Sequence, residues 1–206
     1  MPDSAKLPAA PSGLPGVEAL PGVATLDLSL AFPTALRPVA AALTAPACWH
    51  PAVHRHHRYQ VTLDGEVLTI PARIYVKAEL LWADSGRSAL ERSIAWSLGT
   101  RHHNGYVREA CLTRLLTAPQ PWMAPFIVQL VGEYVDEIVR GIETALPTFA
   151  PDMLAALAGF VRDNPRYLDK TESRTISYRP FHHNAYCADY AGMRVLAWLR
   201  ALGRNG

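Results

Sequence analysis

The stretch Pro121–Leu146 (PWMAPFIVQLVGEYVDEIVRGIETAL) constrains the fold of this chain more than any other. At about 3.6 residues per turn, its apolar side chains cover most of a cylinder, and only a narrow stripe that includes Gln129, Glu133 and Arg140 is polar. A helix of this kind belongs inside a fold, with other elements packed around it. Its ionisable groups argue against a membrane span. We therefore expect a buried helix at the centre of the fold.

The composition is that of a globular protein and indicates no special partner. The chain has 206 residues, 18% of them charged, and a net charge of +2, which is too small to imply nucleic acid or an acidic membrane. Cys48, Cys111 and Cys187 are far apart and odd in number, which favours a reducing compartment over a disulfide framework. The start of the chain does not resemble a signal peptide. We expect a cytoplasmic protein without membrane contact, and no cofactor is predicted.

The chain divides into a tail and one domain. Residues 1–22 are rich in proline and alanine and predict a flexible segment, because they offer little apolar surface to bury. Residues 23–206 are expected to form a single, mainly helical domain. Within it, residues 23–83 carry the β signals and residues 84–206 the helical ones.

The clearest local signal is a β-hairpin over Tyr59–Ile70. Asp64-Gly65 is a two-residue turn of the kind that suits the twist of paired strands. A loop of that length fixes the pairing as Leu63 with Glu66, Val61 with Leu68, and Tyr59 with Ile70. The alternation in Thr25–Leu30 predicts another short strand, which would make the hairpin a three-stranded sheet, and Pro33 opens a helix over Thr34–Leu43.

Beyond residue 84 the pattern predicts only helices, joined by short connections. The expected helices besides the central one are Ser88–Leu98, Gly105–Leu116 capped by Asn104, Pro151–Arg162, a helix from Pro165 capped by Asn164, and Asn184–Leu202. Short connections place successive helices antiparallel. The expected fold is therefore mainly α (α+β), with stacked antiparallel helical hairpins around a central buried helix and a small N-terminal antiparallel β-hairpin or three-stranded sheet.

Residues 88–117 resemble a HEAT-type helical-repeat unit. The residues that carry this resemblance are in NGYVREACLTRLL, which begins at Asn104, after the connection GTRHHN. The resemblance implies a pair of stacked helices whose Val, Ala and Leu residues pack on neighbouring units. A regular repeat of about 40 residues is not found along the chain, so the resemblance implies stacked helical hairpins and no particular function.

A histidine pair followed by asparagine occurs twice, each time before an expected helix. His102-His103-Asn104 is matched by His182-His183-Asn184, which indicates either a duplicated helix entry or two similar N-caps that arose by chance. Together with polar residues of the central stretch, these segments supply the candidate binding residues. They are Arg101, His102, His103, Asn104, Gln129, Glu133, His182, His183 and Asn184.

Glu133 is a candidate for chemistry because it lies among apolar residues of the central stretch. With His103 or His183 nearby, a carboxylate facing a cleft can act as an acid or base. The alternative is a structural ion pair with Arg108 or Arg101.

A metal site is a further hypothesis. Cys48, His50 and His54 carry ligand atoms that zinc prefers, although their spacing fits no familiar motif and arginines lie between them. A solvated basic loop explains the same residues. We therefore expect no bound metal, and a zinc site at these residues is the alternative hypothesis.

Arginines and aromatic residues near the end of the chain raise the possibility of nucleic-acid binding. They are Arg166, Tyr167, Arg174, Tyr178, Arg179, Phe181 and Tyr186. The leading hypothesis is a non-enzymatic intracellular module that presents a helical groove to a protein or peptide. A metal-assisted hydrolase that uses the clustered histidines and Glu133 is the first alternative, and a nucleic-acid-binding helical protein the second.

Overall fold

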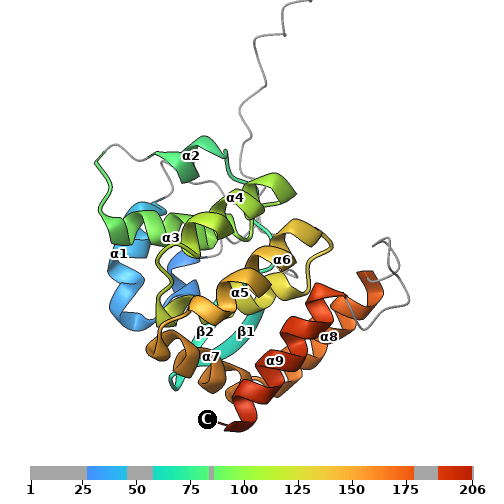
Figure 1. Ribbon diagram of the computed structural model, residues 1–206. Coiled ribbons are helices and arrows are strands. Elements are labelled where there is room, and N and C mark those ends of the chain that lie inside the picture. Colours follow the sequence, from blue (N-terminus) through green and yellow to red (C-terminus); the bar gives the residue numbers. More distant parts are fainter. Residues whose placement is uncertain (1–26, 46–57, 84–85, 179–189, 206) are drawn as a thin grey trace, which may run out of the picture.

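The computed structural model describes residues 27–45, 58–83, 86–178 and 190–205, and it is mainly helical with one small sheet (Figure 1). The strands are β1 (Arg58–Leu63) and β2 (Glu66–Pro71). The helices are α1 (Arg37–Leu43), α2 (Glu79–Trp82), α3 (Ala89–Gly99), α4 (Gly105–Leu115), α5 (Ala124–Val131), α6 (Asp136–Ala145), α7 (Pro151–Asp163), α8 (Pro165–Tyr178) and α9 (Ala191–Asn205). None of the helices in the described part of the chain is long and apolar enough to cross a membrane.

The predicted hairpin and its register are confirmed. β1 and β2 pair antiparallel, with Leu63 opposite Glu66 and Tyr59 opposite Ile70. Asp64 and Gly65 take positive φ values of 49° and 80°, as the two-residue turn requires.

The prediction of a third strand over Thr25–Leu30 is wrong for the described residues of this segment. Leu28–Ala31 form a 3₁₀ helix, while residues 25 and 26 lie outside the described part. The carboxylate of Asp27 accepts the backbone N–H of Ser29 at 2.9 Å, which begins a helical turn in place of an extended chain. Leu28 is buried by this turn, whereas Leu30 is 36% exposed, and the described sheet has two strands.

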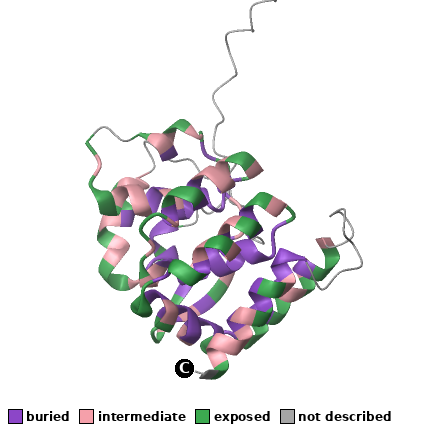
Figure 2. Ribbon diagram, in the orientation of Figure 1, coloured by how far each residue is buried: buried purple, intermediate pink, exposed green. Residues whose placement is uncertain are grey.

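The central stretch is two helices separated by a break, not one helix. All eight residues of α5 are buried, so the expected burial is confirmed for this part (Figure 2). The helix ends at Gly132, where an added Cβ would lie 3.2 Å from the backbone oxygen of Thr171 on α8. After the break, α6 buries only one face, and Tyr134 is 51% exposed. The prediction of one continuous helix is therefore wrong. At the break, Gly132 packs against Thr171 and Glu133 pairs with Arg73 and Arg108.

The predicted Asn104 cap of α4 is confirmed, and α3 and α4 pack closely. Ser88 and Glu91 form a capping box on α3, and the Asn104 side chain accepts the N–H of Tyr106 at the start of α4. Where the two helices meet, a Cβ added at Gly99 would overlap the Cys111 sulfur. Burial raises the pKa of that thiol to about 12, as expected of a core cysteine.

This close approach gives a prediction about two glycines. Gly99→Ala is expected to lower the free energy of unfolding by about 1–3 kcal/mol through overpacking. Gly141→Ala, on α6 with nothing within 4 Å of the added Cβ, is expected to raise it by about 0.5–1 kcal/mol. Urea unfolding of both variants measures the difference. Equal stabilities would contradict the close contact between α3 and α4.

Asn164 joins the hairpin to the C-terminal helices. Its side-chain oxygen accepts the N–H of Thr62 at 2.7 Å, and its amide nitrogen donates to the Thr62 oxygen at 2.6 Å and the Phe160 oxygen at 2.8 Å. These contacts hold β1 beside the junction of α7 and α8. The arrangement places one side of β1 opposite α8.

Candidate functional site

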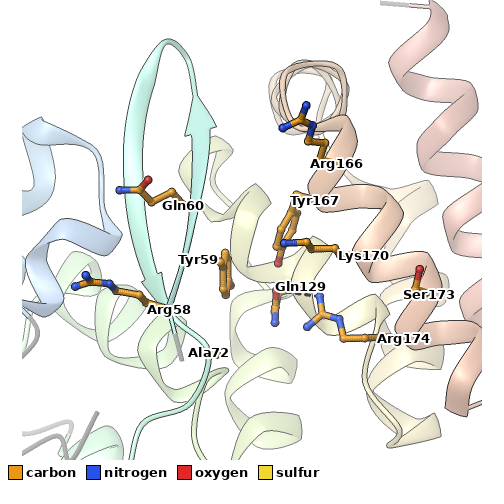
Figure 3. A pocket seen from close by; sticks show the side chains of 10 residues that line it. All are labelled: Arg58, Tyr59, Gln60, Ala72, Gln129, Arg166, Tyr167, Lys170, Ser173 and Arg174. Atoms are coloured by element: carbon orange, nitrogen blue, oxygen red, sulfur yellow. Dashed lines mark hydrogen bonds between the residues drawn. The ribbon is translucent and has the colours of Figure 1, made fainter. Parts of the chain in front are cut away.

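A cavity of about 800 Å³ lies between β1, α5 and α8. Figure 3 shows the hairpin on one side of it, α8 on the other, and Gln129 of α5 between them. The residues that line it are Arg58, Tyr59, Gln60, Ala72, Gln129, Arg166, Tyr167, Lys170, Ser173 and Arg174. Four of these side chains are cationic, and none of the described lining residues is acidic.

Helix α8 separates its charges by face. Arg166, Lys170 and Arg174 follow one another at intervals of four residues and therefore lie on one face, toward the cavity. The acidic residues Asp169 and Glu172 are engaged elsewhere, since both accept hydrogen bonds from Arg200 of α9, at 3.0 and 2.5 Å. Like charges four residues apart destabilise a helix, so helix stability does not explain this row of cations.

A polar network centred on Gln129 forms the inner wall of the cavity. In the amide orientation that satisfies its neighbours, the oxygen accepts from Arg174 Nη1 at 2.8 Å and from Arg101 Nη1 at 3.2 Å. The amide nitrogen donates to the Tyr59 hydroxyl at 3.2 Å and also to that of Tyr167. The two tyrosine rings are stacked, with centroids 5.0 Å apart. Burial raises the pKa of Tyr167 well above its ordinary value, which keeps this phenol neutral.

Arg101 lies behind this wall and has a solvent exposure of 0%. Its Nε donates to the Thr100 hydroxyl at 3.3 Å, while its Nη2 has no hydrogen-bond partner among the described residues. Burial lowers the pKa of the guanidinium, and the fields of Tyr59 and Glu133 oppose this shift. Since an arginine in a protein stays protonated, Arg101 is a buried charge without a carboxylate bound to it.

Glu133 is engaged by two other arginines. Arg108 Nη2 donates to Oε2 at 2.9 Å, and Arg73 Nη2 donates to both oxygens, at 2.9 and 3.1 Å. The predicted pair of Glu133 with Arg108 is therefore confirmed, and Arg73 is the partner that sequence reasoning missed. Arg108 also donates to the backbone oxygens of His102 and His103, so it fixes the connection between α3 and α4.

The first histidine pair is bound into the fold. His102 Nε2 is 2.9 Å from the Val76 oxygen, and its Nδ1 accepts the N–H of Asn104 at 3.1 Å. Burial lowers the pKa of His102, so the neutral ring serves as a hydrogen-bonding link. His103 stacks on Tyr75, with ring centroids 5.1 Å apart.

A second, acidic cavity of about 970 Å³ adjoins the start of α4 and α6. The residues that line it are His103, Asn104, Gly105, Tyr106, Glu109, Tyr134, Val135, Asp136 and Glu137. It therefore brings together His103 and Asn104 from the candidate binding residues, whereas Gln129 lines the basic cavity and Arg101 and Glu133 line neither.

Several predicted site residues cannot be placed. His182, His183 and Asn184, as well as the candidate metal ligands Cys48, His50 and His54, lie outside the described residues. Within the described part, no three His, Cys, Asp or Glu side chains are grouped so that they can hold a metal ion.

Some residues of the basic cavity were predicted from the sequence as candidate binding residues, and others were not. Arg166, Tyr167 and Arg174 belong to the set that the sequence suggested for nucleic-acid binding, and all three line the cavity. Lys170 was missed, although its spacing of four from both arginines marks the same helix face. Arg58 was missed because no local pattern pairs the start of β1 with α8.

The chain was also compared with models of protein families, with curated proteins and with solved structures, and none of them matches it. Its function must therefore be inferred from its own residues.

Proposed function

We propose that the protein is a non-enzymatic binding module that takes an anionic ligand into the cavity between β1, α5 and α8. The observation that carries this proposal is that four cationic side chains, those of Arg58, Arg166, Lys170 and Arg174, line a cavity whose described lining has no carboxylate. Cations held close together repel each other, and an anion among them removes the repulsion and gains charge-assisted hydrogen bonds. The volume of about 800 Å³ lies in the range of small-molecule sites.

The contacts around the other candidate residues favour binding over catalysis. Glu133 has both oxygens engaged by guanidinium groups within the fold, and His102 likewise uses both ring nitrogens there. Tyr167 is buried, so its ring is not available for stacking with a base of a nucleic acid. The protein or peptide partner expected from the sequence stays a prediction, for which the basic cavity gives no specific support.

The proposal predicts a specific loss of anion binding. Inorganic phosphate, sulfate or citrate at constant ionic strength should raise the melting temperature, because a ligand that binds only the folded state stabilises it. Lys170→Glu should weaken this binding by about tenfold or more, since it reverses a charge at the cavity. Lys77→Glu is the matched control, because Lys77 is exposed and does not line the cavity. Equal losses in both variants, or no stabilisation by any anion, would rule the proposal out.

A further inference from the structure

The groups around the Gln129 side chain are suited to a negative charge. Two guanidinium groups, those of Arg101 and Arg174, donate to its amide oxygen, and the hydroxyls of Tyr59 and Tyr167 lie against its nitrogen. Each of these four neighbours can donate a hydrogen bond. A carboxylate of the same shape would satisfy all of them, yet the chain has a neutral amide at this position.

The positive charge near Gln129 is not balanced by the described residues. The nearby carboxylate, that of Glu133, is bound by Arg73 and Arg108. Arg101 is fully buried, its Nη2 lacks an acceptor within the described ranges, and it is one side chain away from the cavity, behind Gln129. A buried charge without a partner is strongly unfavourable, so an external counter-charge is expected close to it.

We infer that the ligand carries a phosphomonoester group in its dianionic form, bound beside Gln129 with Arg101 as a buried counter-charge. This inference rests on the proposed anion-binding function and specifies its ligand. A group with a charge of about −2 balances more of the surplus than a carboxylate or a phosphodiester can. Its three terminal oxygens accept hydrogen bonds from the several arginines of the cavity, whose planar forks match phosphate oxygens. Figure 3 shows Arg174 beside Gln129 and Lys170 pointing from α8 toward the hairpin, whereas the Arg58 side chain is directed away from Gln129.

The test compares methyl phosphate with dimethyl phosphate at pH 8 by calorimetry. The monoester is then a dianion, because its second pKa is about 6, whereas the diester carries one charge. Methyl phosphate should bind at least about tenfold more tightly. A phosphoserine peptide forms a third arm: tighter binding than methyl phosphate assigns the group to a phosphorylated protein, and weaker or equal binding assigns it to a small phosphorylated compound.

Gln129→Glu tests the position of the bound charge. The new carboxylate should pair with Arg101 and Arg174, raise the melting temperature of the ligand-free protein, and weaken methyl phosphate binding on the order of 100-fold. Gln60→Glu is the matched control, since Gln60 lines the same cavity but is exposed, and it should weaken binding only a few-fold. The ligand-free melting temperature shows independently whether the first variant folds.

The possible failures are distinguishable. If neither ester nor any simple anion binds, the proposed function itself is wrong. If dimethyl phosphate binds as tightly as methyl phosphate, or Gln129→Glu leaves methyl phosphate binding unchanged, anion binding stands and the phosphomonoester assignment is overturned.

Discussion

Glu133→Gln is expected to lower the free energy of unfolding by about 3–5 kcal/mol, because it leaves Arg108 as a buried charge without a counter-ion. The Arg108 side chain is 1% exposed, and its Nη2 donates to the Glu133 carboxylate at 2.9 Å. For a chain of this size the melting temperature should fall by on the order of 10 °C. Thermal and urea unfolding, followed by circular dichroism, measure the loss.

Arg73→Gln is the matched control for this pair. Arg73 contacts the same carboxylate, but its side chain is 28% exposed, so water can replace the lost contact. Its removal should lower the free energy of unfolding by only about 1 kcal/mol. If Glu133→Gln is no less stable than Arg73→Gln, then Glu133 does not serve as the counter-ion of Arg108, and a chemical role for its carboxylate has to be considered again.

Arg101→Met is expected to raise the free energy of unfolding, whereas Glu133→Gln lowers it. Methionine has a similar length and needs no counter-charge, so the ligand-free variant should be more stable by about 1–3 kcal/mol. The same substitution should remove the preference for methyl phosphate over dimethyl phosphate. Arg108→Met provides the comparison, because it removes the buried one of the two guanidinium partners of Glu133 and the donor to the backbone oxygens of His102 and His103. It should destabilise the protein by about 3–5 kcal/mol.

Two fully buried arginines would thus respond in opposite directions to one substitution. Arg108 donates to the carboxylate of Glu133, whereas Arg101 donates to the neutral amide of Gln129. The opposite effects on stability are expected from this difference. A loss of stability in Arg101→Met as large as that in Arg108→Met would mean that Arg101 already has its counter-charge within the chain. The need for an anionic ligand at that position would then disappear.

The parts of the fold that depend on neighbouring residues could be predicted from the sequence. The turn at Asp64-Gly65 fixes the hairpin and its register, and Asn104 caps the helix that follows it. In each of these cases the deciding contacts lie within a few residues, so the local pattern holds the necessary information.

The break in the central stretch could not be predicted in this way. The apolar period continues across Gly132, and the residues that draw Glu133 out of a helix, Arg73 and Arg108, lie far from it in the sequence. The same limit applies to the cavity. The row of cations on α8 can be recognised in the sequence from its spacing of four residues. The lack of a carboxylate partner for Arg101 cannot, because it depends on Arg73 and Arg108 binding Glu133 in the folded protein.

The Asn164 side chain also protects the small sheet against unwanted assembly. Both strands of a two-stranded sheet are edge strands, and their unpaired backbone groups can recruit a strand from another molecule. Asn164 presents an amide to the N–H and the C=O of Thr62, in the manner of a neighbouring peptide group. The outer edge of β1 is therefore already occupied near the hairpin turn, which hinders the growth of an intermolecular β-ribbon from this hairpin.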